Sequence, residues 1–264
     1  MLTRTISALV ALPILFFVLL KGGIILYIAA FVISIVGLYE FYKAFSKKYV
    51  VSKWVGYLMT TALYFGFFGA FSKDYFTFIV STFMFCLLAL VVFTKLTING
   101  AMVTFMGFFY VAFSLSHLIL ISNLDNNFFI WYPFIIAFVT DTFAYLTGKL
   151  IGKTKLIPSV SPNKTVEGSL GGIIACLIVS YLYAYYFNPD FEFYAIFLGL
   201  VGSILSQIGD LIASKIKRIF EIKDFGKIMP GHGGVLDRFD SLIITLPLVY
   251  YFMVLFNSIN QYLL

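Results

Sequence analysis

The sequence predicts an all-α polytopic membrane protein, and three observations support this fold class. Of the 264 residues, 61% are hydrophobic and only 11% are charged, whereas a soluble domain carries roughly 25% charged residues. Apolar runs recur along the chain, and most are close to the about 20 residues that a helix needs to cross a bilayer. These runs do not alternate polar and apolar residues as barrel strands do. We therefore expect helices, because lipid offers the backbone no hydrogen-bond partners.

About nine apolar segments qualify as transmembrane helices, or nearly so. They cover residues 5–20, 24–45, 54–72, 76–94, 101–122, 128–148, 170–187, 193–213 and 239–256. The first is short and contains Pro13, so a signal-peptide core is the alternative there. We keep it as a span, because Lys21-Gly22-Gly23 leads directly into the next apolar run and no small-residue cleavage site stands out.

We divide the chain into an N-terminal region of about five spans, residues 1–125, and a C-terminal region of about four spans, residues 126–264. The C-terminal region contains the two long polar loops, 149–169 and 214–238. No soluble domain or internal repeat is evident in the sequence. We therefore expect any catalysis in the C-terminal region.

The basic residues are distributed unevenly between the two sides of this nine-span arrangement. Sixteen of the 18 lie at the N-terminus or in loops on one side, and the other side has only Lys21 and Lys73. Because cytoplasmic loops are enriched in Lys and Arg, we expect a cytoplasmic N-terminus and an outside C-terminus. The same distribution argues against nucleic acid as the reason for the net charge of +6. Both long polar loops then lie at the cytoplasmic face of the cell membrane.

Two acidic residues lie in the predicted sixth and eighth spans. They are Asp141 and Asp210, and acids at membrane depth usually face a water-filled cavity or a charged partner. For Asp141, a structural hydrogen bond between helices is the alternative. On a helix, Asp210, Ser214 and Lys217 share one face, with Arg218 alongside. An acid, a hydroxyl and a base on one face suit a site for metal and phosphate.

Asp237 and Asp240 are three residues apart at the start of the last predicted span, and on a helix they would share a face. Two like charges there repel each other unless a cation joins them. Carboxylates without a Cys cluster select a hard ion, and Mg²⁺ takes one or two carboxylates together with substrate phosphate and water. The alternative is a charged helix start that faces water and interacts favourably with the helix dipole.

A glycine-rich segment, PGHGG from Pro230 to Gly234, precedes these two acids. Its glycines around His232 permit positive φ angles and close backbone approach to a ligand, and successive N–H groups can bind an anion. A plain turn is the alternative, but it would not require the neighbouring Lys223, Lys227 and Arg238. The sequence therefore predicts a substrate with phosphates and an apolar tail.

The stretch SKIKRIFEIKDFGKIMPGHGGVLDRFD, from Ser214 to Asp240, resembles the signature of the phosphatidate cytidylyltransferase (CDP-diacylglycerol synthase) family. Two further stretches also look like this family, DTFAYLTGKLIGKTK from Asp141 and SPNKTVEGSLGG from Ser161. The motifs cover residues 138–245, while the N-terminal half agrees only in having several apolar helices. The signature positions are filled without a gap by Ser214, Lys217, Arg218, Lys223, Asp224, Gly226, His232, Gly233, Gly234, Asp237, Arg238 and Asp240.

The resemblance implies a Mg²⁺-dependent nucleotidyltransferase that transfers CMP from CTP to phosphatidic acid, giving CDP-diacylglycerol and pyrophosphate in phospholipid biosynthesis. It also implies a homodimer in the bilayer, and it leaves open whether a second cation is bound. The implied metal ligands are Asp210 and Asp237, with Asp240 next, and the implied catalytic residues are Asp210, Lys217 and Asp237. The resemblance places Lys217, Arg218, Lys223 and His232 around the nucleotide phosphates. The further candidates for nucleotide and phosphate binding are Ser214, Asp224, Lys227, Gly233, Gly234 and Arg238. The implied supporting residues are Asp141, Ser161, Lys164, Thr165 and Glu167.

Four other functions are alternatives to this one. A CTP-dependent lipid kinase, or a cytidylyltransferase for another lipid phosphate, could use the same residues. A transporter with intramembrane acids would usually show internal repeats and acids near the midplane, whereas here the acids gather toward one face. A CDP-alcohol phosphotransferase is disfavoured, because the sequence has no D-G-x-x-A-R motif with following acids.

Overall fold

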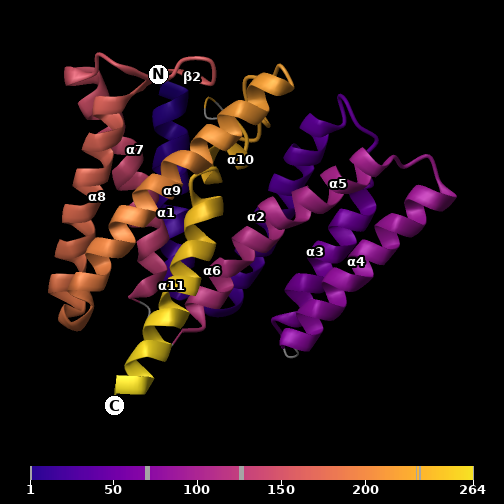
Figure 1. Ribbon diagram of the computed structural model, residues 1–264, viewed down its shortest axis with the longest axis horizontal. Coiled ribbons are helices and arrows are strands. Elements are labelled where there is room, and N and C mark those ends of the chain that lie inside the picture. Colours follow the sequence, from indigo (N-terminus) through magenta and orange to yellow (C-terminus); the bar gives the residue numbers. More distant parts are fainter. Residues whose placement is uncertain (1, 69–71, 125–127, 230, 232, 264) are drawn as a thin grey trace. The chain divides into compact units, whose positions relative to one another are not determined.

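The computed structural model describes residues 2–68, 72–124, 128–229, 231 and 233–263, and it is almost entirely helical (Figure 1). Its α-helices are α1 (Leu2–Lys21), α2 (Gly23–Phe45), α3 (Lys53–Gly66), α4 (Lys73–Phe93), α5 (Ile98–Gly107), α6 (Ser114–Ser122), α7 (Tyr132–Ile151), α8 (Val166–Phe187), α9 (Glu192–Ile219), α10 (Leu236–Phe239) and α11 (Leu242–Leu263). The π-helical turn η1 (Phe108–Phe113) joins α5 to α6, and the 3₁₀ turns η2 (Phe129–Trp131) and η3 (Pro189–Phe191) precede α7 and α9.

Six helical segments of the described chain are long and apolar enough to cross a membrane. They are Gly23–Phe45, Asp74–Phe93, Ile98–Ser122, Phe129–Ile151, Val166–Phe187 and Pro189–Ile219. The prediction of a helical, membrane-integral protein is therefore confirmed. Each of the other three predicted ranges also overlaps a helix, namely α1, the 14-residue α3 and α11. The number of nine spans stays a prediction.

Local sequence signals determine where several helices begin. The side-chain oxygens of Ser72, Thr97 and Thr165 each accept a hydrogen bond of 3.1 Å from the backbone N–H three residues later. These contacts satisfy N–H groups that have no partner within the helix. The caps therefore set the starts of α4, α5 and α8, and the cap at Thr165 places α8 directly after a strand.

The structure contains two compact units. The first comprises Met1–Ile119 and Phe220–Arg238, and the second comprises Leu120–Ile219 and Phe239–Leu264. The first division between the units, after Ile119, lies near the predicted boundary after residue 125. The loop after α9 belongs to the same unit as the N-terminal helices. The two predicted regions were defined by their expected roles, and this division into units does not test those roles.

The first unit is held together by an apolar core between α3, α4, α5 and η1. The contact of α2 with α3 also includes a buried polar pair, since the Ser34 and Tyr64 hydroxyl oxygens are 2.6 Å apart. Burial of apolar surface stabilises this core. Its buried members are Met59, Leu63, Ile79, Phe83, Leu87, Leu96, Ala101, Phe108 and Ala112.

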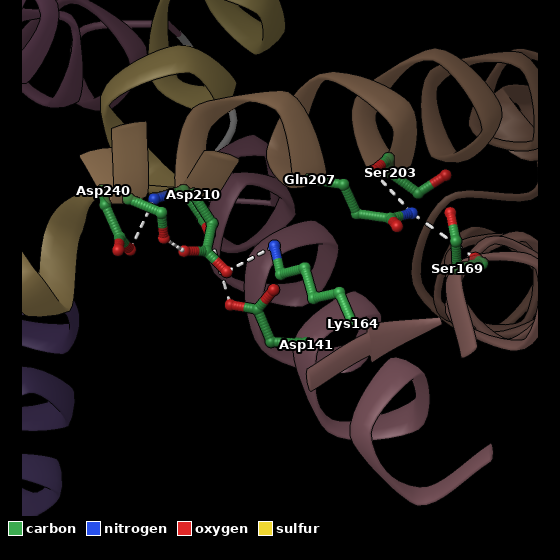
Figure 2. A network of polar contacts seen from close by, with 9 residues as sticks. Asp141, Lys164, Ser169, Ser203, Gln207, Asp210 and Asp240 are labelled. Carbon is green, nitrogen blue, oxygen red and sulfur yellow. Dashed lines mark hydrogen bonds and ion pairs between the residues drawn. The ribbon is translucent and has the colours of Figure 1, made fainter. Parts of the chain in front are cut away.

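The second unit is built from α7, α8, α9 and α11, and α8 lies against both α7 and α9 (Figure 1). Gln207 of α9 is buried and donates through Nε2 to the Ser169 carbonyl oxygen of α8 at 3.4 Å (Figure 2). A buried amide needs such partners. This contact links α9, which carries Asp210, to the start of α8.

A small antiparallel hairpin in the second unit was not predicted. Strands β1 (Lys155–Ile157) and β2 (Ser161–Thr165) pair Lys155 with Thr165 and Ile157 with Ser161. Both strands are short, with three and five residues, and they show none of the apolar alternation that identifies strands from sequence. The hairpin adds a local element to an otherwise all-α structure, and its β2 contains Ser161, Lys164 and Thr165.

Candidate functional site

The predicted polar face of α9 is present in the structure. The Ser214 hydroxyl donates to Asp210 Oδ1 at 3.3 Å, as their spacing of four residues predicts. The Lys164 ammonium of β2 lies 2.5 Å from Asp210 Oδ2, and each of these side chains is about one quarter exposed (Figure 2). The structure therefore places a supporting residue of the sequence prediction, Lys164, in direct contact with the leading metal-ligand candidate.

Asp240 and Asp141 are linked through Ser241. The backbone N–H of Ser241 donates to Asp240 Oδ1 at 2.8 Å, and its hydroxyl donates to Asp141 Oδ2 at 3.2 Å. Helix α10 ends at Phe239, so Asp237 and Asp240 are not on one continuous helix as their spacing suggested. The physical reason is the Asp240 side chain, which bonds the next backbone N–H and so competes with helical hydrogen bonding.

Asp240 interacts electrostatically with other charged residues of the second unit. Desolvation raises the pKa of Asp240 to about 7, with a further increase from Asp210 and a smaller one from Asp141. The charge of Lys217 lowers this pKa. The second unit thus brings Asp141, Lys164, Asp210, Lys217 and Asp240 into one group, which we call the acid–lysine cluster.

Gly209 sets the distance between α9 and the connection that carries Asp240. A Cβ atom added at Gly209 would lie 2.8 Å from the Asp240 carbonyl oxygen, closer than such atoms approach in proteins. We expect Gly209→Val to separate Asp240 from Asp210 and to lower turnover about 10-fold or more, because small displacements of site groups are costly. Steady-state kinetics should show this loss, while Ile208→Val, at an exposed neighbouring position, should retain activity.

Two side chains outside the acid–lysine cluster hold the hairpin in place. Glu167, in the first turn of α8, accepts hydrogen bonds of 3.1 Å from the backbone N–H groups of Lys153 and Thr154. Arg218 of α9 donates through Nε to the Val160 carbonyl oxygen at 3.3 Å. These contacts fix both ends of the hairpin, and the supporting role of Glu167 in the site stays a prediction. A phosphate contact of Arg218 stays a prediction.

The loop that follows α9 belongs to the first unit and is organised around Asp237. The carboxylate of Asp237 is buried, and its Oδ2 accepts two hydrogen bonds, from Phe225 N–H at 2.8 Å and from Gly234 N–H at 2.9 Å. Gly231 and Gly233 have φ angles of 77° and 87°, which confirms the predicted positive-φ conformation. Asp237 therefore shapes this loop, and its metal role stays a prediction.

Sequence reasoning missed Glu40 of α2. This side chain is only 1% exposed, and its two carboxylate oxygens accept from Val235 N–H at 3.1 Å and Leu236 N–H at 2.8 Å. A signal was available, because Glu40 is the only acidic residue in the predicted span 24–45, and acids at membrane depth are usually functional. Asp141 and Asp210 were noticed on this ground, and Glu40 was not.

The remaining predicted phosphate-binding residues lie in the same loop. Lys223, Asp224, Lys227 and Arg238 are exposed, Gly233 is half-buried and Gly234 is buried. His232 lies outside the described residues. No contact of these residues with phosphate is tested by the structure. Their position on a loop fixed by buried carboxylates is compatible with ligand binding, since binding residues often occupy loops on a rigid support.

Among the residues that the structure describes, no group of three or more His, Cys, Asp or Glu side chains is arranged to hold a metal ion by itself. Mg²⁺ usually retains waters and binds through one or two carboxylates plus substrate phosphates, rather than in a cage made only of protein groups. The acid–lysine cluster offers carboxylate oxygens, and Asp210 already contacts one cationic group. This donor set fits a hard divalent cation that is shared with a phosphorylated substrate.

The fold and the acid–lysine cluster define an α-helical membrane protein with a group of interacting acids and lysines in its second unit. Comparison with known families identifies it more closely. Residues 2–256 match the sequence model of the Cytidylyltransferase family, and the chain belongs to this family.

Curated relatives align with most of the length of this chain. A protein of Staphylococcus aureus (strain COL) named phosphatidate cytidylyltransferase is 35% identical over 94% of this chain and 97% of its own length. One of the same name from Staphylococcus haemolyticus (strain JCSC1435) is 34% identical with the same coverage. A third, from Bacillus subtilis (strain 168), is 37% identical over 66% of this chain and 68% of its own length. The resemblance inferred from the motifs is thereby confirmed over nearly the whole sequence.

Proposed function

We propose that this protein is a phosphatidate cytidylyltransferase, which transfers CMP from CTP to phosphatidic acid and releases pyrophosphate, giving CDP-diacylglycerol for phospholipid biosynthesis. The observation that carries this proposal is the acid–lysine cluster in a membrane-integral member of the Cytidylyltransferase family. The names of the curated relatives support it. The apolar surface of the spans suits the acyl chains of a lipid substrate.

The chemistry requires two polyanions to approach each other. A phosphate oxygen of phosphatidic acid attacks the α-phosphorus of CTP, a new phosphorus–oxygen bond forms, and the bond to the β-phosphate breaks as pyrophosphate leaves. The attacking oxygen is already anionic, so no strong general base is needed. The main obstacle is charge repulsion, which positioned cationic groups reduce. In the second unit, Lys164 and Lys217 supply positive charge next to Asp210 and Asp240.

We further propose Mg²⁺ as the cofactor, with Asp210 and Asp240 as the residues of the second unit that would hold it. When bound, Mg²⁺ would supply positive charge to the nucleotide phosphates. Asp237 remains a proposed ligand from the sequence resemblance. A second cation and a homodimer are also proposals from that resemblance.

The proposed arrangement in the membrane has nine spans, a cytoplasmic N-terminus, an outside C-terminus and a site at the cytoplasmic face of the cell membrane. The charge distribution along the sequence supports it, and access to CTP requires it. Cysteine accessibility in right-side-out vesicles tests the arrangement. A cysteine introduced at Lys223 should be protected from an impermeant reagent, and labelling from outside would refute the proposed orientation.

The proposed reaction is tested with purified protein, phosphatidic acid, Mg²⁺ and CTP labelled at either the α- or the γ-phosphate. We expect the α-label in the lipid product and release of pyrophosphate. Transfer of the γ-label would instead identify a lipid kinase and refute the proposal. Replacing phosphatidic acid by another lipid phosphate distinguishes a cytidylyltransferase with a different acceptor.

A further inference from the structure

Glu40 and the loop of residues 223–238 are distant in sequence but in contact within the first unit. The Glu40 carboxylate bridges two adjacent backbone N–H groups, with Oε1 accepting from Val235 and Oε2 from Leu236. Glu40 is almost completely buried. A buried carboxylate is stable only when its oxygens have donors, so α2 and the loop hold each other in this conformation.

Two glycines of the loop are required for this contact. A Cβ atom added at Gly226 or Gly234 would overlap the Glu40 carboxylate, and at both positions the nearest atoms belong to that side chain. Two loop segments therefore close around one carboxylate, and any larger residue would push them away. This explains two of the glycines in the motif without a direct ligand contact.

We propose that Glu40 is a positioning residue for nucleotide binding: it keeps the loop of residues 223–238 in the conformation in which its basic side chains meet the phosphates of CTP. The proposal rests on the proposed function, because it assumes that this loop binds CTP. Glu40 itself touches neither substrate nor cofactor in this account. A loop that is ordered before binding avoids the entropy cost of ordering at the moment of binding.

The hydrogen-bond geometry makes Glu40→Gln an informative variant. Each oxygen of Glu40 serves a different N–H group, whereas a glutamine has one oxygen and presents an NH₂ group to the second N–H. The variant therefore loses one charge-assisted bond and leaves one buried N–H without an acceptor, at nearly unchanged side-chain volume. We expect amide hydrogen exchange in peptides covering residues 225–237 to accelerate about 10- to 100-fold.

The same variant should raise the KM for CTP about 10-fold while kcat at saturating CTP changes much less, because bound nucleotide restores the loop order. The matched control is Ser34→Ala, which removes a buried hydrogen bond between α2 and α3 but does not touch the loop. This control should be less stable to heat, with KM for CTP and loop exchange unchanged. A merely structural role of Glu40 would make the two variants behave alike.

A second variant approaches the contact from the loop, in case Glu40→Gln does not fold. Gly226→Ala leaves α2 intact and places a methyl group against the carboxylate, so it should reproduce the faster exchange and the higher KM. Unchanged exchange in the variants, or faster exchange with an unchanged KM for CTP, would overturn the proposal. The exchange measurement needs no substrate, so it reports on the contact between Glu40 and the loop whether or not the protein is active. Failure of the wild-type protein to convert CTP and phosphatidic acid would refute the proposed function and not this contact.

Discussion

Asp210→Asn is expected to reduce CMP transfer at least about 100-fold, as removal of a central electrostatic group does in other active sites. Asp210 accepts from Ser214, pairs with Lys164 and raises the pKa of Asp240, so it lies at the centre of the acid–lysine cluster. The asparagine has nearly the same shape but no charge. Lys164 would then be partly buried without its anionic partner.

Pyrophosphate release from protein in lipid vesicles measures this loss. Asp190→Asn is the matched control, because it makes the same chemical change at an exposed acid of η3 in the same unit. This control should retain wild-type turnover. Activity of Asp210→Asn within about two-fold of wild type would show that the charge of Asp210 has no role in catalysis.

Asp237→Asn is expected to abolish Mg²⁺-dependent turnover, with a loss of at least about 100-fold, while the loop and membrane insertion stay intact. The bonds from Phe225 and Gly234 to Asp237 allow the charge to be removed while both acceptor contacts are kept. One oxygen, Oδ2, accepts both the Phe225 and the Gly234 N–H bonds, and the single carbonyl oxygen of an asparagine can take its place. Amide exchange in residues 225–237 should therefore match wild type even though activity is lost.

Two comparison variants complete this experiment. Asp237→Ala removes the accepting oxygen, so it should lose activity and also accelerate exchange in the loop, at a stability cost of about 1–3 kcal/mol. Lys48→Gln neutralises an exposed lysine near the Phe220 ring in the same unit and should change activity little. Wild-type turnover in Asp237→Asn would rule out a metal or charge role and leave Asp237 as a purely structural acceptor.

The isosteric amide thus has opposite expected effects at the two buried acids of the first unit. At Asp237 the hydrogen bonds from Phe225 and Gly234 both go to one oxygen, so Asn can accept both of them while it removes the charge. At Glu40 the bonds go to two oxygens, so Gln disturbs the loop. This difference depends on hydrogen-bond geometry and was invisible in the sequence, where both residues are simply acids.

Features that depend on residues close together in the chain were predictable. The helical membrane class follows from the length and hydropathy of continuous segments, and six of these are long apolar helices in the structure. The contact of Ser214 with Asp210 follows from the 3.6-residue helical period. The glycine segment has the predicted positive φ angles because residues without Cβ adopt them readily.

Features that depend on chain segments far apart were not predictable from one sequence. Spacing does not reveal that the hydroxyl of Ser241 reaches Asp141, 100 residues away, or that Glu40 accepts from Leu236, 196 residues away. Such pairs form because buried charges and backbone N–H groups must find partners when helices pack, and the packing selects the partner. The amino-acid order therefore defined a membrane protein with a motif for phosphate chemistry, while helix packing determined which acids form the cluster and which hold the loop.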